Sequence, residues 1–156
     1  MRNVLLKVFM GVAITSVAMF GADNSIGTWK RNIEKSKANP APANPIKSLT
    51  LVYAAVDGGI KVTATGERKD GTAINSTSTV KYDGKEYPVT GATWDTTSMK
   101  QVDANTITFE SKKTGGKYHV TGRTVISKDG KTMTTTSKGT NAEGQPTSST
   151  AVYDKQ

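Results

Sequence analysis

The chain has 156 residues, which is room for one domain, and it contains no cysteine. The lack of cysteine excludes disulfides, thiolate metal sites and cysteine nucleophiles. Its 21 Lys and Arg outnumber its 13 Asp and Glu and give a net charge of +8. No basic run alternates with aromatic residues, as a nucleic-acid groove requires, so we expect no nucleic-acid partner.

The first 22 residues have the pattern of a signal peptide. Arg2 and Lys7 supply positive charge, an apolar run follows from Val8 to Phe20, and the small residues Gly21 and Ala22 end the segment. The run is shorter than the ~20 apolar residues that span a bilayer. We therefore expect a signal peptide over 1–22, cleavage after Ala22, and an exported protein, periplasmic or secreted, with no stable membrane insertion after cleavage. An uncleaved membrane anchor is the alternative, and the oligomeric state stays open.

From Gly27 onward the sequence shows short β-type runs separated by turns, with no helical period. Many turns contain Asp-Gly or Gly-Gly pairs, which supply the positive φ angles of tight hairpins. This spacing predicts consecutive antiparallel hairpins in a single domain over 23–156. We expect strands at 27–33, 46–54, 60–67, 73–82, 86–89, 95–102, 106–112, 117–127, 131–139 and 147–154.

A Pro-rich segment, "KANPAPANP" over 37–45, follows the first expected strand. Its prolines favour extended backbone, so we interpret it as a connector between the first and second strands. It would be either a plain surface loop or a flap over a barrel mouth.

Some expected strands are polar on both faces. The run 131–139 offers only Met133 as an apolar anchor, which is too little for a sheet packed on a solid core. Two-sided polarity indicates a hollow barrel with a partly hydrated interior, and a thin sandwich with weak strands is the alternative.

Several short stretches carry a resemblance to a known group. "GTWK" over 27–30 resembles the Gly-x-Trp start of the calycin superfamily, which includes lipocalins and fatty-acid-binding proteins. "KYDGKEYPVTG" over 81–91 and "SKDGKTMT" over 127–134 resemble stretches of small exported bacterial lipocalin-like proteins. The chain over 27–156 is most similar to small exported bacterial lipocalin-like proteins of unassigned role. The resemblance implies an all-β, up-and-down antiparallel β-barrel of about 8–10 strands. The paired helices that cap fatty-acid-binding proteins are missing, so we expect no helical lid.

The resemblance also implies roles for individual residues. Trp29 would pack across the closed end of the barrel against Lys155, and Gly27 would allow close approach of the backbone there. Fatty-acid-binding proteins hold a carboxylate with an Arg-x-Tyr pair on the last strand; here Tyr153 is present but Ala151 stands at the Arg position. We therefore expect a neutral or weakly polar ligand, or none.

The aromatic residues are the candidate ligand contacts, because small-molecule sites are mostly apolar with a few polar groups. We expect non-catalytic binding of a small hydrophobic or amphipathic molecule, and the alternative is a ligand-free structural or interaction barrel of the cell envelope. An interior cavity of about 300 Å³ or more would favour binding. The tentative lining is Tyr53, Trp94, Phe109, Tyr118 and Tyr153.

We expect no catalytic residues, no metal site and no cofactor. His119 is the only histidine, and its phase opposite to Val120 predicts that it faces away from the interior. Most aspartates lie in turns, where turn formation explains them. Glu110 lies mid-strand, and a cross-strand Lys is its expected partner.

Overall fold

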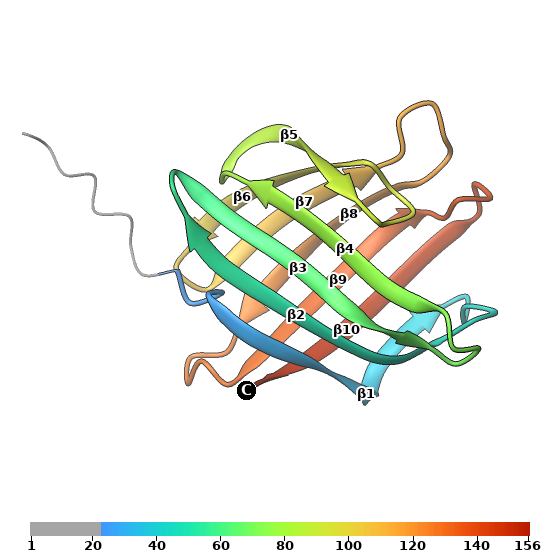
Figure 1. The fold of residues 1–156 in the computed structure, drawn as a ribbon, viewed down its shortest axis with the longest axis horizontal. Helices are drawn as coiled ribbons and strands as arrows, with labels where there is room; N and C mark the ends of the chain where they lie inside the picture. The colour runs from blue at the N-terminus through green and yellow to red at the C-terminus, as the bar shows by residue number, and fades with distance from the viewer. Residues whose placement is uncertain (1–22) are drawn as a thin grey trace, which may run out of the picture.

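The computed structural model describes residues 23–156; the expected signal peptide over 1–22 and its cleavage site lie outside the described residues. These residues form a closed barrel of ten antiparallel strands in which each strand pairs with the next along the chain and the last pairs with the first (Figure 1). The predicted all-β up-and-down barrel is confirmed. The strands are β1 (Gly27–Asn39), β2 (Ile46–Val56), β3 (Gly59–Arg68), β4 (Ala73–Val80), β5 (Asp83–Thr90), β6 (Thr96–Asp103), β7 (Thr106–Lys112), β8 (His119–Ile126), β9 (Thr132–Thr140) and β10 (Pro146–Lys155).

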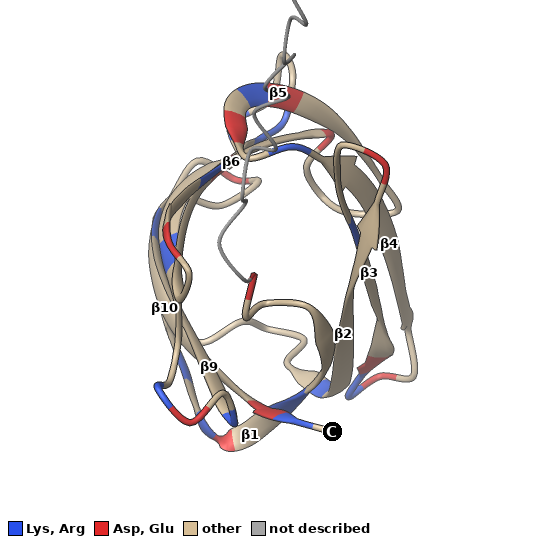
Figure 2. Ribbon diagram, turned by 90° about the vertical axis from the view of Figure 1, so that its left-hand side faces the viewer, with Lys and Arg blue, Asp and Glu red and all other residues tan. Residues whose placement is uncertain are grey.

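The barrel appears as a closed ring when viewed along its interior (Figure 2). Within residues 23–156, no helix is long and apolar enough to cross a membrane.

The first strand is longer than the sequence predicted. It continues beyond Ile33 to Asn39, so the connector covers only 40–45 rather than 37–45. A bulge interrupts its pairing with β10 between Asn32 and Lys37. Ser36 holds this bulge, because its hydroxyl donates to the Asn32 carbonyl at 2.6 Å and accepts the Val152 amide at 3.0 Å. The bulge breaks the side-chain alternation, which is why the sequence pattern ended too early.

Glycine turns and alternation explain the other elements. In the turn before β9, Gly130 has φ of +69°, and the Asp129 carboxylate accepts the Lys131 amide at 3.0 Å. In β8, Val120 and Thr124 point inward and are buried, whereas His119 points outward and is exposed. The period of two therefore assigns each residue to the interior or the surface.

One end of the barrel is closed by packed side chains. Trp29 and Met133 are fully buried there, in a cluster that includes Ile60, Val80 and Ile126. The segment 23–26 lies against this cluster and contributes to the closure. We call this end the floor. The opposite end carries the connector 40–45 and the loops 91–95, 113–118 and 141–145, and we call it the mouth.

Candidate functional site

A cavity of about 580 Å³ lies inside the barrel. This volume exceeds the ~300 Å³ at which small-molecule sites begin. All five aromatic residues expected from the sequence line it, and they come from different parts of the fold. Tyr53 lies on β2, Phe109 on β7 and Tyr153 on β10. Trp94 lies in the loop before β6, and Tyr118 lies in the loop before β8.

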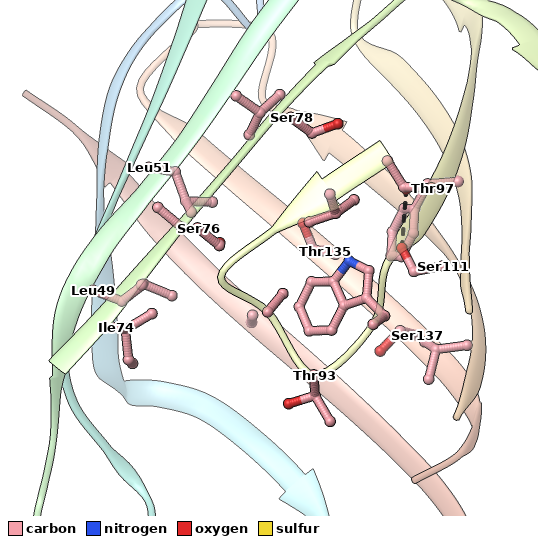
Figure 3. A pocket seen from close by; sticks show the side chains of 18 of the residues that line it. Leu49, Leu51, Ile74, Ser76, Ser78, Thr93, Thr97, Ser111, Thr135 and Ser137 are labelled. Carbon is pink, nitrogen blue, oxygen red and sulfur yellow. Dashed lines mark hydrogen bonds between the residues drawn. The ribbon is translucent and has the colours of Figure 1, made fainter. Parts of the chain in front are cut away.

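One wall of the cavity is mostly aliphatic, although Ser76 and Ser78 of β4 also lie on it (Figure 3). It is formed by aliphatic side chains of β2, β3 and β4, and Figure 3 shows three of them on the same side: Leu49, Leu51 and Ile74. Val62 and Ala64 of β3 complete this wall. Aliphatic surface of this kind favours an apolar ligand body, because transfer of that body out of water is favourable.

The facing wall carries hydroxyl groups from β6 to β10, of which Figure 3 shows Thr97, Ser111 and Ser137. These hydroxyls lie in cross-strand pairs that hydrogen-bond to each other. The oxygen–oxygen distances are 3.0 Å for Thr97 with Ser111, 2.9 Å for Thr124 with Thr135, and 2.8 Å for Ser137 with Ser149. This wall explains the strands that are polar on both faces, because their inner polar residues face the cavity.

An aromatic pair lies at the mouth. The rings of Trp94 and Tyr118 stack with their centroids 5.3 Å apart and their planes at 12°. Burial raises the pKa of the Tyr118 phenol to about 12. Asp95 joins the two loops that carry these rings, since its carboxylate accepts the Thr114 amide at 2.8 Å and contacts Lys113 Nζ at 3.2 Å. The Thr114 amide, more than any other contact, lowers the pKa of Asp95.

The floor brings together the three residues that the resemblance assigned to closure. Trp29 and Lys155 are cross-strand partners, and Lys155 Nζ lies 5.0 Å from the centroid of the indole. Gly27 has φ of +138°, and a Cβ there would lie 2.9 Å from Lys155 Cε. Trp29 Nε1 donates to the Ser25 carbonyl at 2.7 Å. The closure therefore depends on the absence of a side chain at Gly27 as well as on the indole.

The sequence reasoning missed two arginines that line the cavity, Arg31 and Arg68. Arg31 follows Trp29 by two residues, so the strand period places both on the inner face. It is the cross-strand partner of Tyr153, and its Cζ lies 6.0 Å from the centroid of the phenol ring. Burial raises the pKa of Tyr153, and the positive charge of Arg31 counteracts part of that rise. Extending the alternation from Trp29 would have identified Arg31.

His119 lies on the outer surface, where its side chain is 55% exposed. Its Nε2 lies 2.7 Å from Glu110 Oε1. The prediction of a lysine partner for Glu110 is therefore wrong. Lys112, on the same strand, pairs instead with Glu86 of β5. Residues 23–156 contain no group of three or more His, Cys, Asp or Glu side chains that could hold a metal ion.

Comparison with known proteins gave structural neighbours only. No family model matches the chain, and no curated protein matches it. Among solved structures, the chain is similar to EF1p2_mFAP2b bound to DFHBI, with a TM-score of 0.48, 9% identity, and coverage of 85% of this chain and 94% of that one. It is also similar to a redesigned β-barrel, mFAP1, bound to DFHBI, with a TM-score of 0.45, 11% identity, and coverage of 86% and 100%.

Proposed function

We propose that this protein is an exported, non-catalytic barrel of lipocalin-like type that binds a small hydrophobic or amphipathic molecule in its interior. The observation that carries this proposal is the cavity of about 580 Å³, lined by all five aromatic residues named from the sequence. A barrel with a purely structural role can fill its interior with side chains. Here the filled part is confined to the floor, and the space above it is hollow.

The chemistry of the lining favours binding over catalysis. The cavity wall offers aliphatic surface, aromatic rings, paired hydroxyls and two arginines. The only histidine of the chain points to solvent, where a ligand in the cavity would not reach it. The lining is suited to hold and orient a molecule, which is the role we propose.

The binding proposal is tested by native mass spectrometry. The full chain is expressed in the source organism, purified gently and weighed before and after denaturation. We expect a discrete extra mass that is lost on unfolding. The matched control is Ala64→Phe, which places a ring in the cavity from β3 and should abolish the extra mass while circular dichroism still reports a β-barrel. A clean mass for the wild-type protein, together with unchanged tryptophan emission on addition of a lipid panel, would contradict the proposal and favour a ligand-free structural barrel.

The export part of the proposal rests on the signal-peptide pattern of 1–22, and the floor contacts begin just after it. Tyr82 Oη donates to Asp23 Oδ2 at 2.8 Å, and Ser25 is fully buried. Cleavage after Ala22 would leave both contacts in place. Cell fractionation and N-terminal sequencing test this: we expect a mature chain that starts at Asp23 outside the cytoplasm. Recovery of an intact chain in the membrane fraction would favour the uncleaved anchor.

A further inference from the structure

Two of the three hydroxyl pairs in the cavity wall hold a proton that the fold does not use. Thr124 and Thr135 form one of these pairs, and Ser137 and Ser149 form the other; all four side chains line the cavity. A pair of hydroxyls has two protons, and the bond between its members uses only one of them. Among residues 23–156, these four hydroxyls make no hydrogen bonds beyond those within the pairs. Each pair therefore keeps one O–H donor for a molecule in the cavity.

The third pair has no such donor. Thr97 Oγ1 donates to the Glu110 carbonyl at 3.1 Å, so the 3.0 Å bond between Thr97 and Ser111 uses the Ser111 proton (Figure 3). Both protons of this pair are bonded within the protein. The three pairs share one wall of the cavity, but only two of them can donate to a ligand.

The two available donors require an acceptor. Thr124 is only 4% exposed, and a buried donor without an acceptor costs free energy. Water in the cavity can accept these protons, but a ligand that displaces the water must accept them in its place. A pure hydrocarbon would leave both donors without an acceptor. The wall therefore favours a ligand that carries acceptor oxygens.

The charges around the cavity favour a neutral acceptor at this wall. Among the described residues that line the cavity, no Lys or Arg comes from β6 to β10. The two arginines of the lining lie on other strands, where Arg68 donates to the Asn44 carbonyl at 2.9 Å. Arg31 lies beside the ring of Tyr153. A carboxylate among the hydroxyls would be buried without a counter-charge, whereas a ketone or ester carbonyl has no such cost.

The register of β9 sets the spacing of the two donors. Thr135 and Ser137 lie two residues apart on this strand, so both face the cavity about 7 Å apart (Figure 3). The partner of Thr135 lies on β8 and that of Ser137 lies on β10. The facing wall, from β2 to β4, is mostly aliphatic. A ligand that matches both walls carries its oxygens on one edge and apolar surface on the other.

We propose that the cavity binds a neutral, mostly apolar molecule with two carbonyl oxygens about 7 Å apart on one edge. One oxygen accepts from the Thr124–Thr135 pair and the other accepts from the Ser137–Ser149 pair. This inference rests on the proposed binding function and specifies its ligand class, a diketone or diester. The opposite, unsubstituted edge of the ligand lies against the aliphatic wall of β2 to β4.

The first test compares two isomers on the wild-type protein. In its extended form dodecane-2,8-dione has both oxygens on one edge, whereas dodecane-2,7-dione has them on opposite edges. Each isomer is titrated against N-phenyl-1-naphthylamine, a neutral fluorescent probe, bound to the full-length protein freed of lipid. The 2,8-isomer should displace the probe at a concentration at least about fivefold lower, because the 2,7-isomer leaves one donor and one carbonyl unbonded. Equal displacement would overturn the inference while the bound probe still supports the binding function.

The second test removes each donor pair as a whole. The variants are Thr124→Val with Thr135→Val, and Ser137→Ala with Ser149→Ala. A single substitution would not serve, because the remaining hydroxyl keeps its own proton. Removal of both partners leaves no polar side-chain group unbonded, so each variant should fold. Each should reduce the preference for the 2,8-isomer to about one, since only one donor pair then remains.

The control variants separate the donors from the rest of the wall. Thr97→Val with Ser111→Ala removes the pair whose protons are both engaged and should keep the preference at about fivefold or more. Ser76→Ala, on the facing wall, should not narrow the preference. Thr121→Val, at an exposed outer position of β8, should leave it unchanged. Loss of the preference in any of these controls would overturn the inference.

Two further outcomes are decisive. If dodecanoic acid displaces the probe at a lower concentration than dodecane-2,8-dione, the ligand is an anion and the inference is wrong, although the binding function stands. If neither the probe nor any of these compounds binds, the binding function fails together with the inference.

Discussion

Trp29 closes the floor because its indole is buried among apolar side chains, donates a hydrogen bond and contacts a lysine ammonium. The ring is fully buried, its Nε1 donates to the Ser25 carbonyl at 2.7 Å, and Lys155 Nζ lies 5.0 Å from its centroid. Since Lys155 is exposed, its contact with the ring is worth about 0.5–1 kcal/mol rather than the larger value of a desolvated pair. The apolar packing of the indole contributes more to the closure than the cation does.

Lys155→Met should therefore destabilise the barrel by a small amount. The variant keeps an unbranched apolar stem over the indole but removes the ammonium group, so we expect the free energy of unfolding to fall by about 0.5–1 kcal/mol. Urea denaturation followed by tryptophan emission measures it. Lys128→Met, in the exposed turn before β9, is the control and should stay within about 0.5 kcal/mol of wild type. A loss at Lys155 no larger than that of the control would show that the cation does not stabilise the floor.

Among individual residues, the sequence predicted the positions of the large aromatic side chains but not the contacts of the charged ones. Trp29 and the five aromatic residues could be named because large rings in a Thr-rich chain have few places to be buried. Arg31 was missed because a basic residue in a positively charged chain is normally assigned to solvent. The Glu110 partner was predicted wrongly because strand register is decided by pairing across the whole sheet, which one strand does not reveal.

Among the elements, β5 is the most weakly attached strand. It pairs with β4 at only two positions, Thr77 with Thr90 and Ser78 with Val89, whereas β2 and β3 pair at ten. A side chain replaces part of the missing ladder, because Ser78 Oγ donates to the Pro88 carbonyl at 2.8 Å. Proline cannot donate to a ladder, so Pro88 also limits the pairing that β5 can make.

Hydrogen exchange should therefore be faster in β5 than in β3. Local opening free energies follow the density of local contacts, so we expect the amides of 83–90 to lose protection well before those of 59–68. Ser78→Ala removes the bond to Pro88 and should speed exchange in β5 further, by the equivalent of about 1 kcal/mol, with little change in β3. Mass spectrometry of peptic fragments measures both. Equal protection of the two strands would contradict this account.

The sequence predicted the number of strands well and some of their ends poorly. Asp-Gly turns such as that at Gly130 mark hairpins because their positive φ is a local requirement. The end of β1 depends instead on the bulge held by Ser36 and Val152, residues 116 positions apart. No pattern within β1 contains that information, which is why the connector was placed three residues too early.

The whole molecule combines a filled floor with a hollow upper part, and buried tyrosines lie from the floor, at Tyr82, to the mouth, at Tyr118. Burial raises the pKa of the Tyr53, Tyr82, Tyr118 and Tyr153 phenols above their ordinary value. A phenol with a raised pKa in the folded state stabilises the fold in full below the ordinary tyrosine pKa of about 10. This stability is lost as the pH rises through the folded value, because the unfolded chain then releases protons that the folded barrel retains.

The barrel should therefore unfold at alkaline pH, and its buried tyrosines should ionise over the same pH range as the unfolding. For Tyr118, whose pKa is about 12, the loss of unfolding free energy between pH about 10 and 12 is on the order of 2–3 kcal/mol. Denaturation curves across this range, with tyrosinate absorbance recorded in parallel, measure it. Tyr118→Phe should flatten the decline by removing one buried phenol. Tyrosinate absorbance that rises fully while the barrel stays folded would show that these phenols are open to solvent, and the cavity wall would then be far wetter than its apolar side chains indicate.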